Sequence, residues 1–121
     1  MVTSRIVATG AGIPSQVITN DDLAQIMDTS DEWIRQRTGI GERHISGGED
    51  LSYYTTKAAR QIIERAGIAP EDIDLIVVAT VTADYCTPSA ACMVQKEIGA
   101  VNAVAFDVTA ACSGFLYGVS V

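Results

Sequence analysis

The sequence has no apolar run long enough to cross a membrane, and it is poor in positive charge. Among its 121 residues, eight lysines and arginines stand against fifteen aspartates and glutamates, which gives a formal net charge of −7. A membrane-spanning helix needs about 18 or more consecutive apolar residues, so no membrane segment is expected. The first residues have no signal-peptide pattern, and we expect a cytoplasmic protein. Nucleic-acid-binding proteins gather basic charge on one face, so no nucleic acid partner is expected.

Histidine and cysteine are also scarce. The single His44 and the three cysteines, Cys86, Cys92 and Cys112, form no CxxC pair and no zinc-ligand spacing, so no metal site is predicted. An odd number of cysteines without a secretion signal favours reduced thiols. Each of them also fits the common role of a small buried hydrophobic residue. His44 stands in a polar, glycine-rich loop, where a lone histidine is usually exposed.

Apolar runs and helical patterns alternate along the chain. Strands are expected at residues 5–9, 75–80 and 103–108, and the last two are continuous apolar runs, typical of strands buried on both faces of a layered α/β protein. Helices are expected after a cap at Thr19 or Asn20, from Thr29 to Gly39, from Leu51 to Gly67, and from Thr87 and Pro88 to Gly99. A last helix follows residues 109–115 and has no stop signal. We therefore expect residues 1–121 to be one amino-terminal half-domain, incomplete at its C-terminus.

Cys112 is the strongest candidate for a reactive residue. It follows the predicted strand 103–108 and stands at or just before the start of a helix, among small residues. Free amides at a helix amino terminus favour thiolate over thiol and can hold the oxyanion of an acyl-transfer intermediate. The same order of strand, tight turn, nucleophile and helix serves other acyl-transfer enzymes. A buried structural cysteine would occupy such a position as well.

Two other patterns have competing interpretations. Arg35, Arg37 and Arg43 fall within nine positions and indicate either a solvated face with ordinary salt bridges or a local phosphate site. Gly10, Ala11 and Gly12 follow the first predicted strand, as in a dinucleotide-binding loop. Ser15 stands where the third glycine of that motif belongs, so no dinucleotide site is expected.

Three segments carry a resemblance to a known family. They are residues 28–34 with 37–40 (DTSDEWI and RTGI), residues 87–92 (TPSAAC) and residues 106–115 (FDVTAACSGF). On these segments the whole chain resembles the β-ketoacyl-acyl-carrier-protein synthase III family, the condensing enzymes that start type II fatty-acid synthesis. The resemblance implies an α/β fold, the thiolase-like layered fold, of which this chain is expected to be the first half only.

The resemblance also implies roles for individual residues. Cys112 matches the cysteine that accepts the acyl group of acyl-coenzyme A. Trp33 and Arg37 match residues that hold the adenine end of coenzyme A, by stacking and by charge, and Thr29 lies in the same segment. Thr87 stands where the family often has a bulky aromatic residue at the floor of the acyl pocket. A primer longer or more branched than acetyl is therefore expected to fit.

The implied reaction condenses the Cys112-bound acyl group with malonyl-acyl-carrier-protein, in a homodimer, with no cofactor beyond the coenzyme A thioester substrate. The family's catalytic histidine and asparagine belong to the second half of the fold, so the isolated chain is expected to be inactive. Two alternatives stay open. One is a related condensing enzyme of the polyketide, quinolone or hydroxymethylglutaryl type, and the other is a non-catalytic fragment that needs a second polypeptide.

Overall fold

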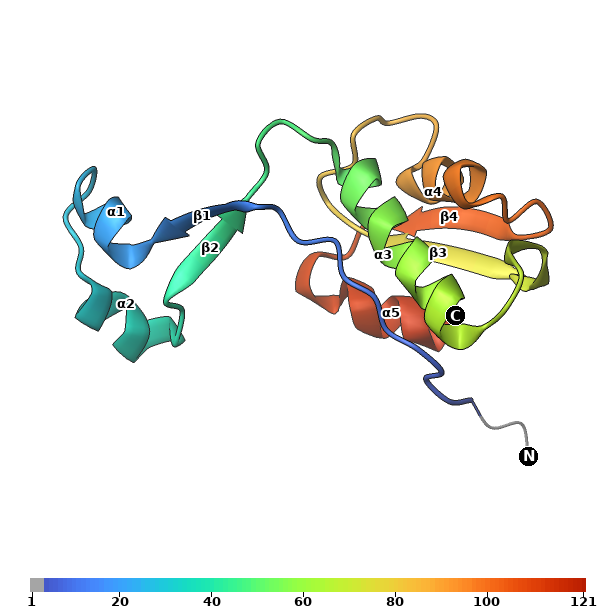
Figure 1. Cartoon of the computed structure of the whole chain (residues 1–121), viewed down its shortest axis with the longest axis horizontal. Coiled ribbons are helices and arrows are strands. Elements are labelled where there is room, and N and C mark those ends of the chain that lie inside the picture. The colour runs from blue at the N-terminus through green and yellow to red at the C-terminus, as the bar shows by residue number, and fades with distance from the viewer. Residues whose placement is uncertain (1–3) are drawn as a thin grey trace. The chain divides into compact units, whose positions relative to one another are not determined.

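The computed structural model describes residues 4–121, which form two compact units. One unit is Ile13–Glu49, and the other joins the residues up to Gly12 with Asp50–Val121. Their helices and strands are labelled in Figure 1. The sequence analysis did not separate these units, because no linker-like composition marks either boundary.

The Ile13–Glu49 unit consists of two paired strands and two helices. Strands β1 (Gln16–Thr19) and β2 (Glu42–Ile45) are antiparallel, with Gln16 opposite Ile45. Helices α1 (Asn20–Ala24) and α2 (Asp31–Thr38) follow one another between the strands. Neither strand was expected, because a four-residue segment is too short to show a clear alternation of apolar and polar residues.

Polar caps define where the helices of this unit begin. Thr19 caps α1, which was one of the two predicted alternatives: its hydroxyl accepts from the N–H of Asp22, and the Asp22 carboxylate accepts from the N–H of Thr19. The second helix was expected to begin near Thr29, which is confirmed, but Thr29 is not its cap. The cap is Ser30, whose Oγ accepts from the Trp33 N–H at 3.1 Å, since serine offers the same acceptor one position later. Gly39 ends α2 with φ of 74°, as predicted.

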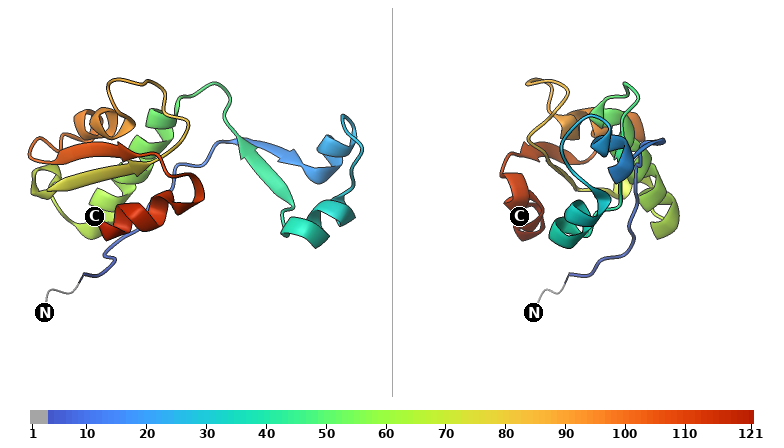
Figure 2. Two further views of the ribbon diagram at one scale, coloured as in Figure 1. Left: turned by 180° about the vertical axis from the view of Figure 1, so that it is seen from behind. Right: turned by 90° about the vertical axis from the view of Figure 1, so that its left-hand side faces the viewer.

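The larger unit is built on a parallel pair of strands. Strand β3 (Leu75–Ala79) pairs with β4 (Val104–Val108), and Val77 lies opposite Phe106. Helix α3 (Leu51–Ala66) contacts α4 (Ala90–Ile98), and both α4 and α5 (Gly114–Ser120) contact the two strands. Figures 1 and 2 show α5 on the face of the strand pair away from α4. The predicted layering of helices on both faces of the strands is therefore confirmed.

Residues 5–9 were expected to form a strand, and this is wrong. No described residue pairs with them in a ladder, and Ile6 and Val7 are 82% and 63% exposed. A run of apolar residues becomes a strand only when a neighbour accepts and donates its backbone hydrogen bonds.

The segment that follows runs along α3. The Gln61 side chain donates to the Ala11 carbonyl at 2.9 Å and accepts from the Ala11 N–H at 3.3 Å. A β-carbon at Gly10 would collide with the backbone of Ala58, and one at Gly12 with that of Tyr54. These two glycines therefore allow close packing against a helix, which accounts for their spacing without a dinucleotide.

Helix α4 supplies three of the five buried apolar residues that the structure describes in this unit. It begins at Ala90 rather than directly after Thr87 and Pro88, because the Ser89 hydroxyl caps it by accepting from the Cys92 N–H at 3.2 Å. Gly99 ends it, as predicted. The buried apolar side chains of this unit are small: Ala90, Ala91, Val94, Ala100 and Ala103. Among the described residues, no helix is both long and apolar enough to cross a membrane.

Candidate functional site

Cys112 lies on a tight turn between β4 and α5. The 3-10 turn η2 (Ala111–Ser113) carries it, two residues before α5 begins. Ala111 has φ of 44°, a conformation that is uncommon for residues other than glycine. Such strained backbone clusters at active sites, where it directs a neighbouring side chain. The Cys112 side chain is exposed, and its predicted place just before a helix is confirmed.

This turn is held close to the end of the strand pair. Gly114 is buried, and a β-carbon there would lie only 2.9 Å from the Ala79 Cβ, so glycine lets α5 start next to β3. The Thr80 N–H donates to the Val108 carbonyl at 3.2 Å, which continues the pairing to the strand ends. The base from which Cys112 projects is therefore well fixed.

A cavity of about 520 Å³ lies at the carboxyl ends of β3 and β4. Its lining includes the first residue after each strand, Thr80 and Thr109, together with Tyr85, Cys86 and Ser89. Crevices at the carboxyl ends of parallel strands are the usual ligand sites of open α/β sheets. Thr87 is exposed in the same loop as Cys86, yet neither Thr87 nor Cys112 lines this cavity. The role of Thr87 in an acyl pocket stays a prediction.

Two carboxylates of the same cavity hold the amino termini of helices. Asp84 accepts from the first two amides of α3, at 2.7 and 2.8 Å. Asp107 accepts from the first two amides of α4, both at 2.8 Å. Burial acts to raise the pKa of Asp84, but hydrogen bonds from Ser52 and Leu51 outweigh it and hold the pKa below its usual range. Both carboxylates therefore serve as helix caps, a use that the sequence pattern did not reveal.

Trp33 and Arg37 are neighbours on an exposed side of α2. The indole is 56% exposed, and the Arg37 guanidinium carbon lies 5.6 Å from the centre of its ring. Thr29 is half-buried and lies just before the cap, outside the helix. All three residues belong to the Ile13–Glu49 unit, whereas Thr87 and Cys112 belong to the other unit. An exposed indole beside a guanidinium offers a stacking surface and a positive charge to a nucleotide.

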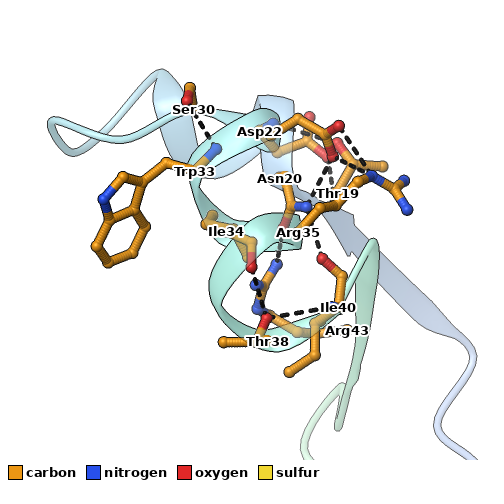
Figure 3. A network of polar contacts seen from close by, with 11 residues as sticks. Thr19, Asn20, Asp22, Ser30, Trp33, Ile34, Arg35, Thr38, Ile40 and Arg43 are labelled. Carbon is orange, nitrogen blue, oxygen red and sulfur yellow. Dashed lines mark hydrogen bonds and ion pairs between the residues drawn. The ribbon is translucent and has the colours of Figure 1, made fainter.

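Asn20 is the centre of a polar network next to this helix (Figure 3). Its Nδ2 donates to Asp31 Oδ1 at 2.7 Å and to the Ile40 carbonyl at 2.8 Å. Its Oδ1 accepts from Arg43 Nη1 at 2.8 Å. The hydrogen bond from Asn20 is the main cause that lowers the pKa of Asp31, and Arg35, which donates to Asp31 at 2.8 Å, lowers it further. The sequence analysis considered Asn20 only as a helix cap, because no local pattern links positions so far apart.

The three clustered arginines were predicted either to form ordinary salt bridges or to form a phosphate site, and they differ in their partners. Arg35 forms an ordinary salt bridge with Asp31, and Arg43 donates to Asn20. Arg37 makes no ion pair or side-chain hydrogen bond with any residue of the described range 4–121. Of the three, Arg37 is the one left for an anion.

Known proteins are similar to almost the whole of this chain. No family model matches the chain. The chain is 56% identical over 116 residues to the β-ketoacyl-[acyl-carrier-protein] synthase III of Clostridium botulinum, and the alignment covers 96% of this chain and 36% of that protein. This chain resembles β-ketoacyl-acyl-carrier-protein synthase III. The synthase III resemblance read from three sequence segments is thus confirmed, and the chain spans about a third of the length of these relatives.

The similarity to synthase III extends to the fold, as solved structures show. The 3-oxoacyl-[acyl-carrier-protein] synthase III of Aquifex aeolicus matches with a TM-score of 0.90 at 47% identity, over 94% of this chain and 37% of that one. The priming β-ketosynthase of the R1128 polyketide pathway also matches with a TM-score of 0.90, at 37% identity, over 96% of this chain and 35% of that one. The chain therefore has part of the thiolase-like fold, as expected. Among residues 4–121, no group of three or more potential ligand side chains is arranged to hold a metal ion.

Proposed function

We propose that this chain supplies the acyl-accepting cysteine and part of the coenzyme A site of a condensing enzyme that initiates type II fatty-acid synthesis. The observation that carries the proposal is the position of Cys112, an exposed thiol that follows the strained residue Ala111 on a turn between strand and helix. The high identity to proteins named synthase III supports it.

In the proposed first step, the Cys112 thiolate attacks the thioester carbonyl of acyl-coenzyme A. A new carbon–sulfur bond forms, and the coenzyme A thiolate leaves as the old thioester bond breaks. The neighbours Ala110, Ala111 and Ser113 are small, which leaves room for the carbonyl. We propose that a backbone amide of the turn holds the oxyanion, a contribution that is commonly the largest single one in acyl transfer.

In the second step, malonyl-acyl-carrier-protein loses carbon dioxide, and the resulting carbanion attacks the acyl group. A carbon–carbon bond forms, and Cys112 leaves again as thiolate. The resemblance to synthase III assigns decarboxylation to a histidine and an asparagine in the second half of the fold. We therefore propose that the isolated chain is inactive, that the complete enzyme is a cytoplasmic homodimer, and that it needs no cofactor besides its thioester substrate.

The coenzyme A site would be formed in part by α2. Trp33 is proposed to stack on the adenine and Arg37 to bind a phosphate, with Thr29 in the adjoining segment. The exposed indole and a guanidinium without an acidic partner among residues 4–121 support these roles, since a planar guanidinium is a natural phosphate partner. Thr87 is proposed to line the acyl pocket and to admit primers longer than acetyl.

The decisive experiment is to incubate the complete enzyme with labelled acetyl-coenzyme A and to map the label by peptide mass spectrometry. The expected result is label on Cys112 alone. Cys86 is a matched control, because it is also an exposed free thiol. Label on Cys86 or Cys92 with Cys112 unmodified would contradict the assignment.

A priming ketosynthase of polyketide synthesis is the second candidate, since one such enzyme gives a TM-score of 0.90 at 37% identity. The two candidates differ in the carrier protein that delivers the malonyl group. Parallel assays with a fatty-acid carrier protein and a polyketide carrier protein separate them, and we expect faster condensation with the former.

A further inference from the structure

The Ile13–Glu49 unit has almost no apolar core. Among its residues only Asn20 and Ile34 are buried, at 1% and 7% exposure. A unit that buries so little apolar surface gains little stability from the hydrophobic effect. Hydrogen bonds must therefore contribute much to holding its helices and strands in place. Several of them are made by the Asn20 side chain.

The Asn20 carboxamide holds α2 near both of its ends. One Nδ2 hydrogen bond reaches Asp31, the first residue of the helix, and the other reaches the carbonyl of Ile40, just beyond its glycine stop. Its Oδ1 accepts from Arg43 of β2, and its backbone N–H donates to the Gly41 carbonyl at 3.3 Å. All the polar atoms of the buried side chain thus have partners, and these partners come from α2, from β2 and from the connection between them.

This arrangement sets which side chains of α2 are available to a ligand. Asp31 and Arg35 are one helical turn apart and bind each other beside Asn20. Trp33 and Arg37 are also one turn apart, two positions further round the helix, and Figure 3 shows Trp33 projecting away from the network. Asp31, which Asn20 holds, pairs with Arg35, whereas Arg37 has no acidic partner among residues 4–121.

We infer that Asn20 is a positioning residue for coenzyme A binding: it fixes α2 against β2 so that Trp33 and Arg37 face the ligand while Arg35 does not. Asn20 itself makes no contact with the ligand in this inference. The ligand identity rests on the proposed function, whereas the positioning of α2 does not.

The variant Asn20→Asp tests the inference. It replaces both N–H donors of the carboxamide and sets a second carboxylate against Asp31. The double variant Asn20→Asp, Asp31→Asn restores a donor–acceptor pair between positions 20 and 31, with its direction reversed, and keeps the acceptor for Arg43. The matched control is Asp22→Asn. Asp22 belongs to the cap of α1, where its carboxylate accepts from the N–H and the hydroxyl of Thr19.

The measurement uses the full chain, in which Trp33 is the single tryptophan. Coenzyme A is titrated while Trp33 fluorescence is followed, and alkylation of Cys112 by iodoacetamide is timed in parallel. Loss of a hydrogen bond to a charged group predicts a dissociation constant about tenfold higher for Asn20→Asp. We expect the double variant to recover part of this affinity, because its hydrogen bond to the Ile40 carbonyl stays broken. We expect the control to bind like the wild type, and Cys112 alkylation to be the same in all four proteins.

Three results would overturn the inference: unchanged affinity in Asn20→Asp, no recovery in the double variant, or an equal loss in Asp22→Asn. If Asn20→Asp does not fold, Asn20→Gln takes its place, because it keeps the same groups and displaces them by one methylene.

Failure of the proposed function gives a different result. If neither the wild-type chain nor the complete enzyme binds coenzyme A, the proposed coenzyme A site is wrong. Hydrogen exchange of the α2 amides then decides the positioning role alone. Faster exchange in Asn20→Asp that is reversed in the double variant supports it, and unchanged exchange overturns it.

Discussion

Trp33 is an aromatic residue that leaves more than half of its surface in contact with solvent, beside a cation that has no acidic partner among residues 4–121. A core aromatic residue would be buried, so exposure removes the main structural explanation for an indole at this position. Its sequence neighbours Asp31 and Glu32 are acidic and lie in the first turn of the same helix. That its ring lies next to Arg37 could be predicted from the spacing alone, since residues four apart on a helix are neighbours.

Replacing Trp33 by alanine in the complete enzyme should weaken coenzyme A binding selectively. A base that stacks on an aromatic side chain gains about 1–3 kcal/mol, so the Michaelis constant for acyl-coenzyme A should rise by roughly tenfold or more. The rate at which iodoacetamide alkylates Cys112 should stay nearly unchanged. Trp33→Phe is the control and should lose less. An equal loss of binding and of Cys112 reactivity would instead assign Trp33 a role in folding.

Thr87 gives a second prediction at the scale of one side chain. If it lines the acyl pocket, Thr87→Phe should shift the preference of the complete enzyme toward acetyl and away from branched or longer primers. One added or missing group in an apolar pocket changes selectivity by about 1–3 kcal/mol. The check is the ratio of kcat/KM for acetyl-coenzyme A and isobutyryl-coenzyme A. A primer profile identical to that of the wild type would exclude Thr87 from the pocket.

At the scale of helices and strands, the stops were easier to predict than the starts. Gly39, Gly67 and Gly99 all have positive φ and end their helices where the sequence indicated. The starts of α3 and α4 depend on Asp84 and Asp107, which are distant in sequence from the amides they bind. A local pattern cannot reveal such a partner.

The cap of α3 yields a prediction with a control in the same helix. Asp50 is the residue just before α3, yet its side chain makes no cap hydrogen bond, since Asp84 occupies that place. Asp84→Asn should therefore lower the free energy of unfolding by about 1–2 kcal/mol, the usual range for a helix cap or a charged hydrogen bond. Asp50→Asn should change it by less than about 0.5 kcal/mol. Urea unfolding followed by circular dichroism measures both, and equal effects would contradict the assignment of the cap.

The strands show why part of the fold could not be predicted from the sequence. Residues 75–80 and 103–108 were recognised because each is a continuous apolar run, and they pair as β3 and β4. Residues 5–9 have the same character but no partner among the described residues, whereas β1 and β2 pair without any strong pattern. Pairing is a property of two segments, and a single segment does not determine it.

For the whole molecule, acid should be destabilising. Hydrogen bonds from Thr19 lower the pKa of Asp22, the hydrogen bond from Asn20 lowers that of Asp31, and the amides of α3 lower that of Asp84 against the effect of burial. A carboxyl group with a lowered pKa in the folded state stabilises the fold above its unfolded pKa. That contribution is lost as the pH falls through the folded pKa.

The free energy of unfolding should thus be nearly constant between pH 7 and about 5 and fall below about pH 4, where aspartates begin to protonate. Urea midpoints measured at intervals from pH 7 to 3 provide the check, and Asp84→Asn should show a shallower decline than the wild type. Stability that stays level down to pH 3 would contradict the assigned hydrogen bonds.

The last prediction concerns catalysis by the chain alone. It aligns with 36% of the length of its Clostridium botulinum relative. Its only histidine is His44, and the Nδ1 atom of that side chain lies 2.7 Å from the carbonyl oxygen of Pro14. Decarboxylation of a malonyl group needs donors that stabilise the developing enolate, and a thiolate at Cys112 is not a donor. We therefore expect the purified 121-residue chain to form no ketoacyl product from acetyl-coenzyme A and malonyl-acyl-carrier-protein, although Cys112 can still be alkylated.

Activity that appears only when the remaining part of a synthase III is added would agree with this expectation. Sustained turnover by the chain alone, abolished in Cys112→Ala, would show that the groups for decarboxylation are already within these residues.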